Sequence, residues 1–274
     1  MNVSVVKGML LQLAAFVYKW MSGEEVLPLN MADDSVDDSF EGCRDSMHAL
    51  VLSNYTDYEK EHTPGFKAAW ENALNNDAKD ELNINQSAAI YLYTENCYVN
   101  IDCSFKEFNT ATRKGKGAYK SDHFQFYTLF FYLTDAVQQL NLRHKKCVTT
   151  YRKTDKTFET DVFNKTIRFG SFTSSSLDLN ITGFGEDSCF NITTCLGAEV
   201  YNYSRYHIEK EVLIPPYEVF RVTAVKNKHE QKDLWCNVVY ELEHAGNKSD
   251  LRCSKVIGRP SVLRPHLSET SFGK

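Results

Sequence analysis

Residues 209–220 read EKEVLIPPYEVF, and this stretch decides how the second half of the chain folds. Its aliphatic run stops at two consecutive prolines, which cannot donate to a strand ladder, and an alternating run resumes directly after them. The pattern predicts two strands, over residues 211–214 and 217–225. Glu209 and Glu211 lie at the start of the first strand, where side chains two residues apart share one face. Taken alone, such a pair is usually a solvated strand edge.

Similar short runs fill the rest of the second half. They are rich in β-branched and aromatic residues, several of them alternate between apolar and polar positions, and turn residues separate them. The sequence therefore predicts a series of strands. The candidate strands are residues 147–152, 166–173, 189–195, 198–203, 211–214, 217–225 and 234–241.

The first half has helical periodicity instead. Apolar residues recur at helical spacing after Thr63-Pro64, which places a proline at the first helical position. The apolar face of this helix consists of Phe66, Ala69, Trp70, Ala73 and Leu74. Ser104 and Glu107 predict a capping box for a second helix, with Gly115 as its stop.

The longest predicted helix opens at Ser121-Asp122. Its aromatic residues are better explained as core than as cofactor contacts, because they recur on one stripe. That stripe consists of Phe126, Leu129, Phe130, Leu133, Val137 and Leu140. Helices first and strands afterwards indicate an α+β fold, with a helical N-terminal half packed on a mostly antiparallel β core, rather than a doubly wound sheet.

Composition excludes several classes of protein. The 274 residues, 42% of them hydrophobic and 24% charged, describe a folded globular chain of one large domain or two small ones. The net charge of −5, with both signs interspersed, offers no basic field to attract nucleic acid. No run of roughly 18 apolar residues exists, so no segment is expected to span a membrane.

The cysteines and glycosylation sequons favour a compartment outside the cytosol. No cysteine pair has CxxC spacing and no histidine lies at zinc-finger spacing, which disfavours a metal site and leaves either disulfides or free buried thiols. The eight cysteines are Cys43, Cys97, Cys103, Cys147, Cys189, Cys195, Cys236 and Cys253. After residue 22, Asn-X-Ser/Thr sequons, which mark N-glycosylation acceptors in secreted proteins, begin at Asn54, Asn85, Asn164, Asn180, Asn191, Asn202 and Asn247.

The ends of the chain agree with secretion. Lys7 precedes an apolar stretch over residues 8–18, and small residues follow, so residues 1–22 are expected to be a signal peptide; the alternative is a retained amphipathic helix. Residues 23–254 are expected to form a single domain and residues 255–274 a flexible tail. The tail lacks the hydrophobic segment of a GPI signal, so we expect a secreted protein, a monomer without a membrane anchor.

Several common catalytic motifs are missing from the chain. It contains no GxGxxG after a strand, no phosphate-binding GxxxxGK[ST], no GxSxG and no HExxH. A dinucleotide, if bound, is therefore not held by a Rossmann turn. Metal-dependent and serine-hydrolase chemistry are disfavoured for the same reason.

Three segments carry the remaining chemistry, in chain order. Tyr151-Arg152 lies at the end of one predicted strand. RFGSFTSSS, at 168–176, ends a second strand and is rich in hydroxyl side chains. Glu209-Lys210-Glu211 begins a third. Each has a plain structural explanation when taken singly: a surface strand residue, a turn and a solvated edge. Their order and density in one chain favour a shared site.

Together these segments resemble the ecto-mono-ADP-ribosyltransferases, the arginine-modifying relatives of the R-S-E class of bacterial toxins. The resemblance covers roughly residues 28–255. The matching segments are EGC at 41–43, YLYT at 91–94, FKEFNTATRKG at 105–115, TYR at 150–152, RFGSFTSSSL at 168–177, GFGED at 183–187, TTCLGAEV at 193–200 and EKEVLIPPYEVF at 209–220. The resemblance implies a β core of the ADP-ribosyltransferase type.

The implied reaction is NAD-dependent mono-ADP-ribosylation of protein arginines, with NAD as a substrate, NADP as its analogue and no metal. Glu211 would stabilise the oxocarbenium-like state that forms as nicotinamide leaves. Glu209 would orient or deprotonate the acceptor guanidinium. Arg152 would bind the NAD phosphates or ribose through its planar fork.

The resemblance assigns further cofactor contacts. Ser174 would hydrogen-bond the nicotinamide ribose region and brace the catalytic glutamate. Phe184 would pack against nicotinamide, and Tyr93 and Ser171 would contact the dinucleotide.

Two positions depart from the family pattern. Lys153 stands where family members usually carry glycine after the strand arginine, at a position whose backbone approaches the nicotinamide amide, so the resemblance leaves open whether its side chain crowds the pocket. Tyr206-His207 replaces the usual aromatic-proline pair before the glutamates.

The resemblance also pairs Cys43 with Cys253 and Cys147 with Cys195. The four remaining cysteines allow three connectivities. A bond between Cys97 and Cys103 is favoured because five intervening residues can form a loop that brings the two together. That choice leaves Cys189–Cys236.

Two other functions compete with arginine modification. One is NAD glycohydrolysis, with water as the acceptor, which would need Glu211 but not Glu209. The other is a non-catalytic binding module on the same fold, which the departure at Lys153 favours and the complete set of Arg152, Ser174 and Glu211 disfavours.

Overall fold

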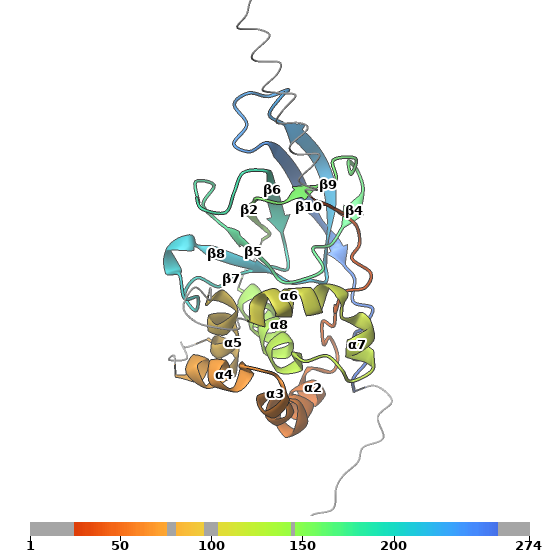
Figure 1. Cartoon of the computed structure of the whole chain (residues 1–274), viewed down its shortest axis with the longest axis vertical. Coiled ribbons are helices and arrows are strands. Elements are labelled where there is room, and N and C mark those ends of the chain that lie inside the picture. Colours follow the sequence, from red (N-terminus) through yellow and green to blue (C-terminus); the bar gives the residue numbers. More distant parts are fainter. Residues whose placement is uncertain (1–24, 76–80, 96–103, 144–145, 257–274) are drawn as a thin grey trace, which may run out of the picture.

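The computed structural model describes residues 25–75, 81–95, 104–143 and 146–256. Helices of the first half form one layer and strands of the second half form the other (Figure 1). The helices are α2 (Arg44–Leu50), a π-helical turn (Val51–Tyr55), α3 (Thr56–His62), α4 (Phe66–Leu74), α5 (Ile84–Thr94), α6 (Ser104–Lys114), α7 (Lys116–Lys120), α8 (Tyr127–Asn141) and a 3₁₀ turn (His207–Glu209). The strands are β1 (Val26–Leu27), β2 (Val148–Thr154), β3 (Thr157–Phe158), β4 (Thr166–Ile167), β5 (Thr173–Ser176), β6 (Ser188–Thr194), β7 (Ala198–Glu199), β8 (Glu211–Ile214), β9 (Glu218–Asn227) and β10 (Val238–Asn247).

Eight of these strands form one mixed sheet, in the order β4-β9-β10-β6-β2-β5-β8-β7. Every neighbouring pair in it is antiparallel except β10 and β6, which run parallel. Strands β1 and β3 pair separately. The predicted α+β class, with a helical first half and a mostly antiparallel β core, is confirmed.

Three predicted strands have different limits in the structure. The run 166–173 is interrupted: β4 ends at Ile167 and pairing resumes at β5, because Gly170 adopts the left-handed conformation with φ of +73°. A side chain at Gly170 would also collide with Ala32, since a Cβ there would lie 2.6 Å from the Ala32 Cβ. The strand expected over 198–203 ends at Glu199, and the one expected over 234–241 runs instead over β10.

The predicted helix after Thr63-Pro64 is present, but it starts two residues late. Pro64 lies in a turn, Gly65 precedes the helix with φ of +73°, and α4 begins at Phe66. Phe66, Trp70 and Ala73 of its predicted apolar face are buried, and Ala69 and Leu74 are partly buried. Helix α6 ends at Lys114, directly before the predicted stop at Gly115.

Helix α8 begins at Tyr127 and not at Ser121-Asp122. Asp122 has a φ of +61°, which is incompatible with an opening helical turn. The cap comes from another helix: the buried carboxylate of Glu59, on α3, accepts hydrogen bonds from the backbone nitrogens of Tyr127 and Thr128. A buried acceptor from a distant segment satisfies donors that the local sequence leaves unpaired.

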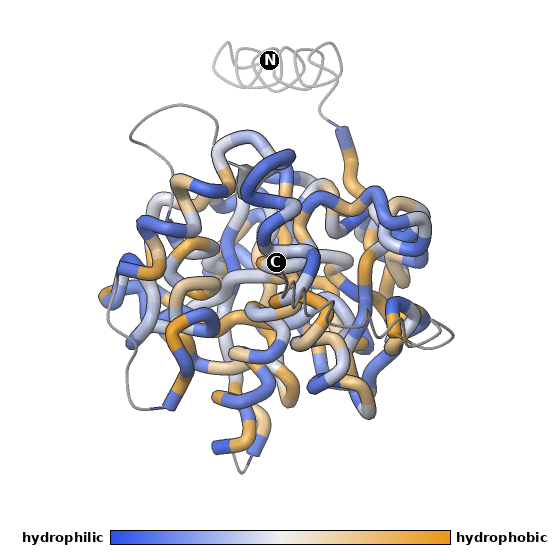
Figure 2. The backbone as a smooth tube through the Cα atoms, turned by 90° about the horizontal axis from the view of Figure 1, so that it is seen from below, coloured by the Kyte–Doolittle hydropathy of each residue, from blue (hydrophilic) through white to orange (hydrophobic). Residues whose placement is uncertain are grey.

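The core has two main parts. One lies within the helical layer and around α8, whose predicted stripe is entirely buried, and the other lies between the sheet and the segments that cover it. Figure 2, which views the molecule from the helical side, shows hydrophobic and hydrophilic residues alternating along the tube, as expected for helices that bury one face. No helix among the described residues is long and apolar enough to cross a membrane.

Disulfides join the ends of the domain and brace the sheet. The described residues contain Cys43–Cys253, Cys147–Cys195 and Cys189–Cys236, which are the pairs expected from the sequence. The proposed bond between Cys97 and Cys103 lies outside the described residues, as do the expected signal peptide and residues 257–274 of the expected tail.

The N- and C-terminal segments are also joined by buried polar contacts. The Asp38 carboxylate accepts hydrogen bonds from the backbone nitrogen of Cys253 and from the Tyr119 hydroxyl. The Lys255 ammonium, at the start of the expected tail, is buried and bonds to Asp122. The packed domain therefore includes Lys255, which was expected to belong to the tail.

The capping contact gives a prediction for stability. Replacing Glu59 by alanine leaves two buried backbone donors unsatisfied, so the free energy of unfolding should fall by about 1–3 kcal/mol, measured by urea denaturation. Glu59→Gln retains an acceptor and should recover part of the loss. Glu61→Ala, on the exposed side of the same helix, is the matched control. Equal stability of the Glu59→Ala and Glu61→Ala proteins would contradict the capping role.

Candidate active site

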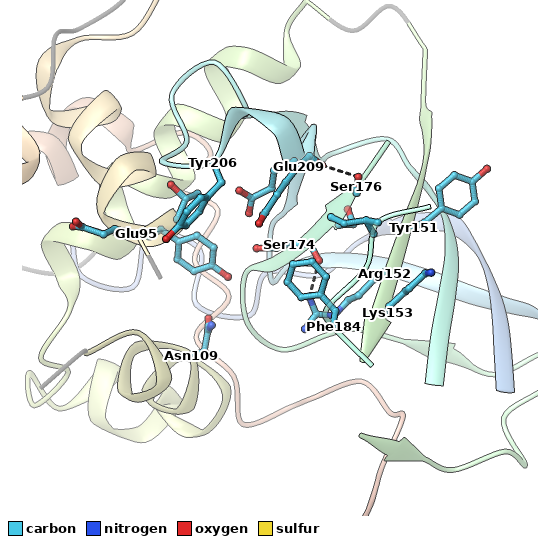
Figure 3. Close-up of a pocket in the computed structure, with 15 residues that line it drawn as sticks. Glu95, Asn109, Tyr151, Arg152, Lys153, Ser174, Ser176, Phe184, Tyr206 and Glu209 are labelled. Atoms are coloured by element: carbon cyan, nitrogen blue, oxygen red, sulfur yellow. Dashed lines mark hydrogen bonds between the residues drawn. The ribbon is translucent and has the colours of Figure 1, made fainter. Parts of the chain in front are cut away.

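A pocket lies where the helical layer meets the sheet, and residues from both layers line it (Figure 3). Its cavity volume is about 260 Å³. Helices α5 and α6, strands β2, β5 and β8 and the loops before β6 and β8 contribute the lining. The lining residues are Tyr93, Thr94, Glu95, Asn109, Tyr151, Arg152, Lys153, Ser174, Ser175, Ser176, Ile181, Phe184, Tyr206, Glu209 and Glu211.

The pocket opens where strands β2 and β5 separate. These strands share one register pair, Tyr151 with Ser176, next to which the Thr150 hydroxyl donates to the Ser176 carbonyl at 2.7 Å. Beyond that pair the Arg152 guanidinium donates to the Ser174 carbonyl at 2.6 Å and takes the place of a ladder hydrogen bond. Because a buried carbonyl needs a donor, the arginine both satisfies the backbone and holds its own fork in the opening.

Glu209 and Glu211 both reach the pocket, but not from one strand face. Glu209 ends a 3₁₀ turn, Lys210 adopts the left-handed conformation with φ of +45°, and only Glu211 belongs to β8. The Ser176 hydroxyl fixes the turn by donating to the Glu209 carbonyl at 2.6 Å. The expectation of strand alternation was therefore wrong, and the left-handed residue brings the two carboxylates to the same cavity.

Burial sets the charge state of Glu211. Its side chain is buried, and loss of solvation raises the pKa of its carboxyl to about 7. Hydrogen bonds from Ser174 and Ser204 and the positive charge of Arg152 oppose that shift, whereas the neighbouring Glu209 charge adds to it. The Ser204 hydroxyl lies 3.3 Å from the Glu211 Oε2. A carboxyl poised near neutrality in a cleft is typical of an acid–base or electrostatic role.

The other ionisable groups of the pocket respond to burial in the same way. Burial lowers the pKa of the Arg152 guanidinium, which stays charged, and raises the pKa of the half-buried Glu209 carboxyl. Burial also raises the pKa of the Tyr93 hydroxyl, which donates to the Phe172 carbonyl at 3.0 Å. The pocket thus holds a cation and two carboxyls in a weakly solvated space, where each charge acts strongly on its neighbours.

Phe184 projects at the open side of the pocket with 41% of its surface exposed (Figure 3). Gly183 and Gly185 on either side of it both have positive φ, and a Cβ on Gly185 would lie 2.5 Å from the Asp155 backbone nitrogen. The two glycines therefore allow the tight loop that presents the ring. Ser171 is not among the lining residues: it is buried, and its hydroxyl accepts from the Arg113 guanidinium at 2.8 Å.

The Lys153 side chain turns away from the centre of the pocket. Its ammonium lies 5.5 Å from the centroid of the Trp235 ring, which Tyr151 also contacts, because residues 151 and 153 share the strand face opposite to Arg152 (Figure 3). Lys153 still lines the pocket, but its ammonium lies beside Trp235 and not at the centre of the cavity.

Several residues of the site lie in no sequence pattern that assigns them a role. Asn109 lies in a quoted segment, FKEFNTATRKG, but no pattern singled it out. In the sequence Ser204 is only the third residue of the Asn202 sequon, although its hydroxyl reaches Glu211. Glu95 lines the pocket next to residues 96–103, which lie outside the described part. No signal in a single sequence separates these from ordinary surface residues.

The family described as NAD:arginine ADP-ribosyltransferase matches residues 29–237. The chain belongs to this family. Among its relatives, NAD(P)(+)–arginine ADP-ribosyltransferase 2 of Gallus gallus is 32% identical over 73% of this chain and 66% of that protein. Ecto-ADP-ribosyltransferase 5 of Homo sapiens is 33% identical over 77% of each chain. The chain spans slightly less than two thirds of the chicken relative.

Solved structures of the ADP-ribosyltransferase family share the fold. The crystal structure of the eukaryotic mono-ADP-ribosyltransferase ART2.2 has a TM-score of 0.65 and 27% identity, and covers 83% of this chain and 98% of its own. Two further structures, of ART2.2 mutants, are complexes with NADH and with NAD. Among the described residues of this family member, no group of three or more His, Cys, Asp or Glu side chains could hold a metal ion.

The buried glutamate gives a prediction for titration. The Glu211 carboxyl should titrate near pH 7, observed by carbon NMR of the glutamate carboxyls. Ser204→Ala removes a hydrogen bond to the charged form and should raise this pKa, whereas Glu209→Gln removes a like charge and should lower it. A Glu211 midpoint near the ordinary value of about 4.5 in all three proteins would contradict the assignment.

The raised pKa has a consequence for stability. The folded state binds a proton that the unfolded chain releases, so this group should make the protein less stable as the pH rises from about 4.5 to about 7. Glu211→Gln should remove that part of the pH dependence.

Proposed function

We propose that this chain transfers ADP-ribose from NAD to arginine side chains of proteins and releases nicotinamide. The observation that carries the proposal is the meeting of Arg152, Glu209 and Glu211 in one cavity between the two layers. The family relation supports it, and the structures of ART2.2 mutants with NADH and NAD support a dinucleotide as the ligand.

The pocket suits the departure of nicotinamide. As the bond between the ribose C1′ and the nicotinamide nitrogen breaks, its electron pair leaves with neutral nicotinamide and positive charge develops on the ribose. The Glu211 carboxylate would stabilise that charge, since a buried and fixed anion acts strongly in a weakly solvated site. Arg152 would hold the diphosphate, while Ser174, Tyr93 and the Phe184 ring would position the nicotinamide end. Ser171 would act only indirectly, because it lies behind the lining with Arg113.

The second carboxylate suits arginine as the acceptor. A guanidinium is protonated at neutral pH and is a weak nucleophile in that state. Glu209 would orient it and accept one proton as a guanidinium nitrogen forms the new bond to C1′. The bond from C1′ to the nicotinamide nitrogen is thus replaced by a bond from C1′ to the acceptor nitrogen. Without Glu209 only water would remain as an acceptor, which would give the hydrolysis expected of a glycohydrolase.

We propose that the protein acts outside the cytosol. The three disulfides of the described residues fit an oxidising compartment, and relatives are named as ecto or GPI-linked enzymes. Arginine-bearing extracellular proteins would be its acceptors, and the protein would act as a monomer.

The two glutamates should separate the half-reactions. Glu211→Gln should lower nicotinamide release by on the order of 10²–10³, the effect of removing one transition-state charge. Glu209→Gln should abolish transfer to agmatine, a small guanidine, while NAD hydrolysis remains measurable. Nicotinamide release with and without agmatine measures both. If the wild-type protein releases no nicotinamide, the binding-module alternative holds; if Glu209→Gln loses both activities together, Glu209 does not act on the acceptor.

The neighbours Arg152 and Lys153 should differ sharply. Arg152→Lys loses the planar fork and its bond to Ser174, so kcat/KM for NAD should fall at least about tenfold, which corresponds to ~1.4 kcal/mol. Lys153→Met keeps the stem and loses only the contact with Trp235, so the KM for NAD should be unchanged. A lower KM in the Lys153 variant would show that this side chain does crowd the dinucleotide.

A further inference from the structure

The sequons of the described chain differ in how they could accommodate a sugar. Asn85 and Asn191 are half-buried within helix α5 and strand β6, and Asn54 lies inside the π-helical turn. Asn164 and Asn247 are exposed, at a turn and at the end of β10. Because an N-linked glycan is bulky and polar, it needs an asparagine whose side chain points into solvent.

Asn180 meets this requirement next to the pocket. It lies in the turn between β5 and β6, where its backbone nitrogen donates to the Asp178 carboxylate at 2.9 Å and the Ile181 nitrogen donates to the Asp178 carbonyl at 3.3 Å. The Asn180 and Thr182 side chains are exposed, and the Asn180 amide makes no hydrogen bond to any described residue. The turn is thus fixed by its backbone while the amide stays available.

The position of this turn relates the sequon to the cavity. Ile181, the next residue, lines the pocket, and so does Phe184 three residues further on. Asn202 also lies near the site, but the serine of its sequon, Ser204, is buried and occupied with Glu211. Asn180 is therefore the sequon whose attached group would lie at the mouth of the pocket without disturbing its interior.

We propose that Asn180 carries an N-linked glycan that limits which arginines reach the pocket. The glycan would admit small guanidines and arginines on flexible segments and would hinder those on folded protein surfaces. This inference rests on the proposed function for its effect on acceptors, but not for the attachment itself.

The attachment uses a donor that the secretory lumen supplies, an oligosaccharide linked to a polyprenyl pyrophosphate. The Asn180 side-chain nitrogen bonds to C1 of the first sugar and gives up one proton. The bond between that C1 and the pyrophosphate oxygen breaks, and the polyprenyl pyrophosphate leaves. No oxidation takes place.

The attachment is tested on the full chain secreted from mammalian cells. Peptide mass spectrometry before and after enzymatic deglycosylation should find Asn180 converted to aspartate by the treatment. Thr182→Ala should abolish this conversion, and Thr182→Ser, which keeps the sequon, should retain it. An unmodified Asn180 in the secreted wild-type protein would overturn the proposal.

The effect on acceptors is tested by rate ratios. Transfer to a folded arginine-bearing protein, such as lysozyme, should rise several-fold in Thr182→Ala, while transfer to agmatine stays unchanged. Asn247→Gln is the matched control, because Asn247 pairs with Glu218 at the start of β9, which follows the end of β8 opposite to Glu211, and it should change neither rate. An occupied Asn180 with an unchanged ratio of the two rates overturns the proposed effect. If no glycoform hydrolyses NAD or transfers ADP-ribose to agmatine, the proposed function is overturned. The glycan occupancy of Asn180 would still be known from the peptide masses.

Discussion

The site depends on one backbone carbonyl that its neighbouring strand does not satisfy. Strands β2 and β5 part after a single register pair, and the Ser174 carbonyl would be left without a donor if Arg152 did not supply one. The arginine is thereby fixed in the opening that the separation creates. The same contact therefore fixes the separation of β2 and β5, the opening between them and the position of the Arg152 guanidinium. A change in one of the three would alter the other two.

The rest of the site is arranged around that opening. The hydroxyl-rich strand β5 fixes the turn before β8 through Ser176, and the left-handed Lys210 turns Glu209 back toward the buried Glu211. The two carboxyls therefore differ in environment although they are two residues apart. Burial raises the pKa of both carboxyls, that of the buried Glu211 to about 7, while the half-buried Glu209 is the one that an incoming side chain could contact.

The sequence predicted those features that local pattern encodes. Alternation and β-branched residues predicted most strands, the apolar stripe of α8 predicted its burial, and the motif around Glu209 and Glu211 predicted where the site lies. The start of α8 could not be predicted, because its cap comes from Glu59, far away in the chain. The conformation of Lys210 was missed because a lysine gives no sign of a positive φ. The direction of the Lys153 side chain depends on Trp235, which only the tertiary fold brings beside it.

The bond between Cys43 and Cys253 encloses most of the residues that the structure describes. One cut by a protease anywhere between these two cysteines would leave both fragments covalently attached, and the buried contacts of Asp38 with Cys253 and Tyr119 would still hold the terminal segments together. A nicked molecule would keep its mass under non-reducing conditions and fall apart only after reduction. Proteolysis in an exposed loop would therefore leave the two halves of the pocket in place.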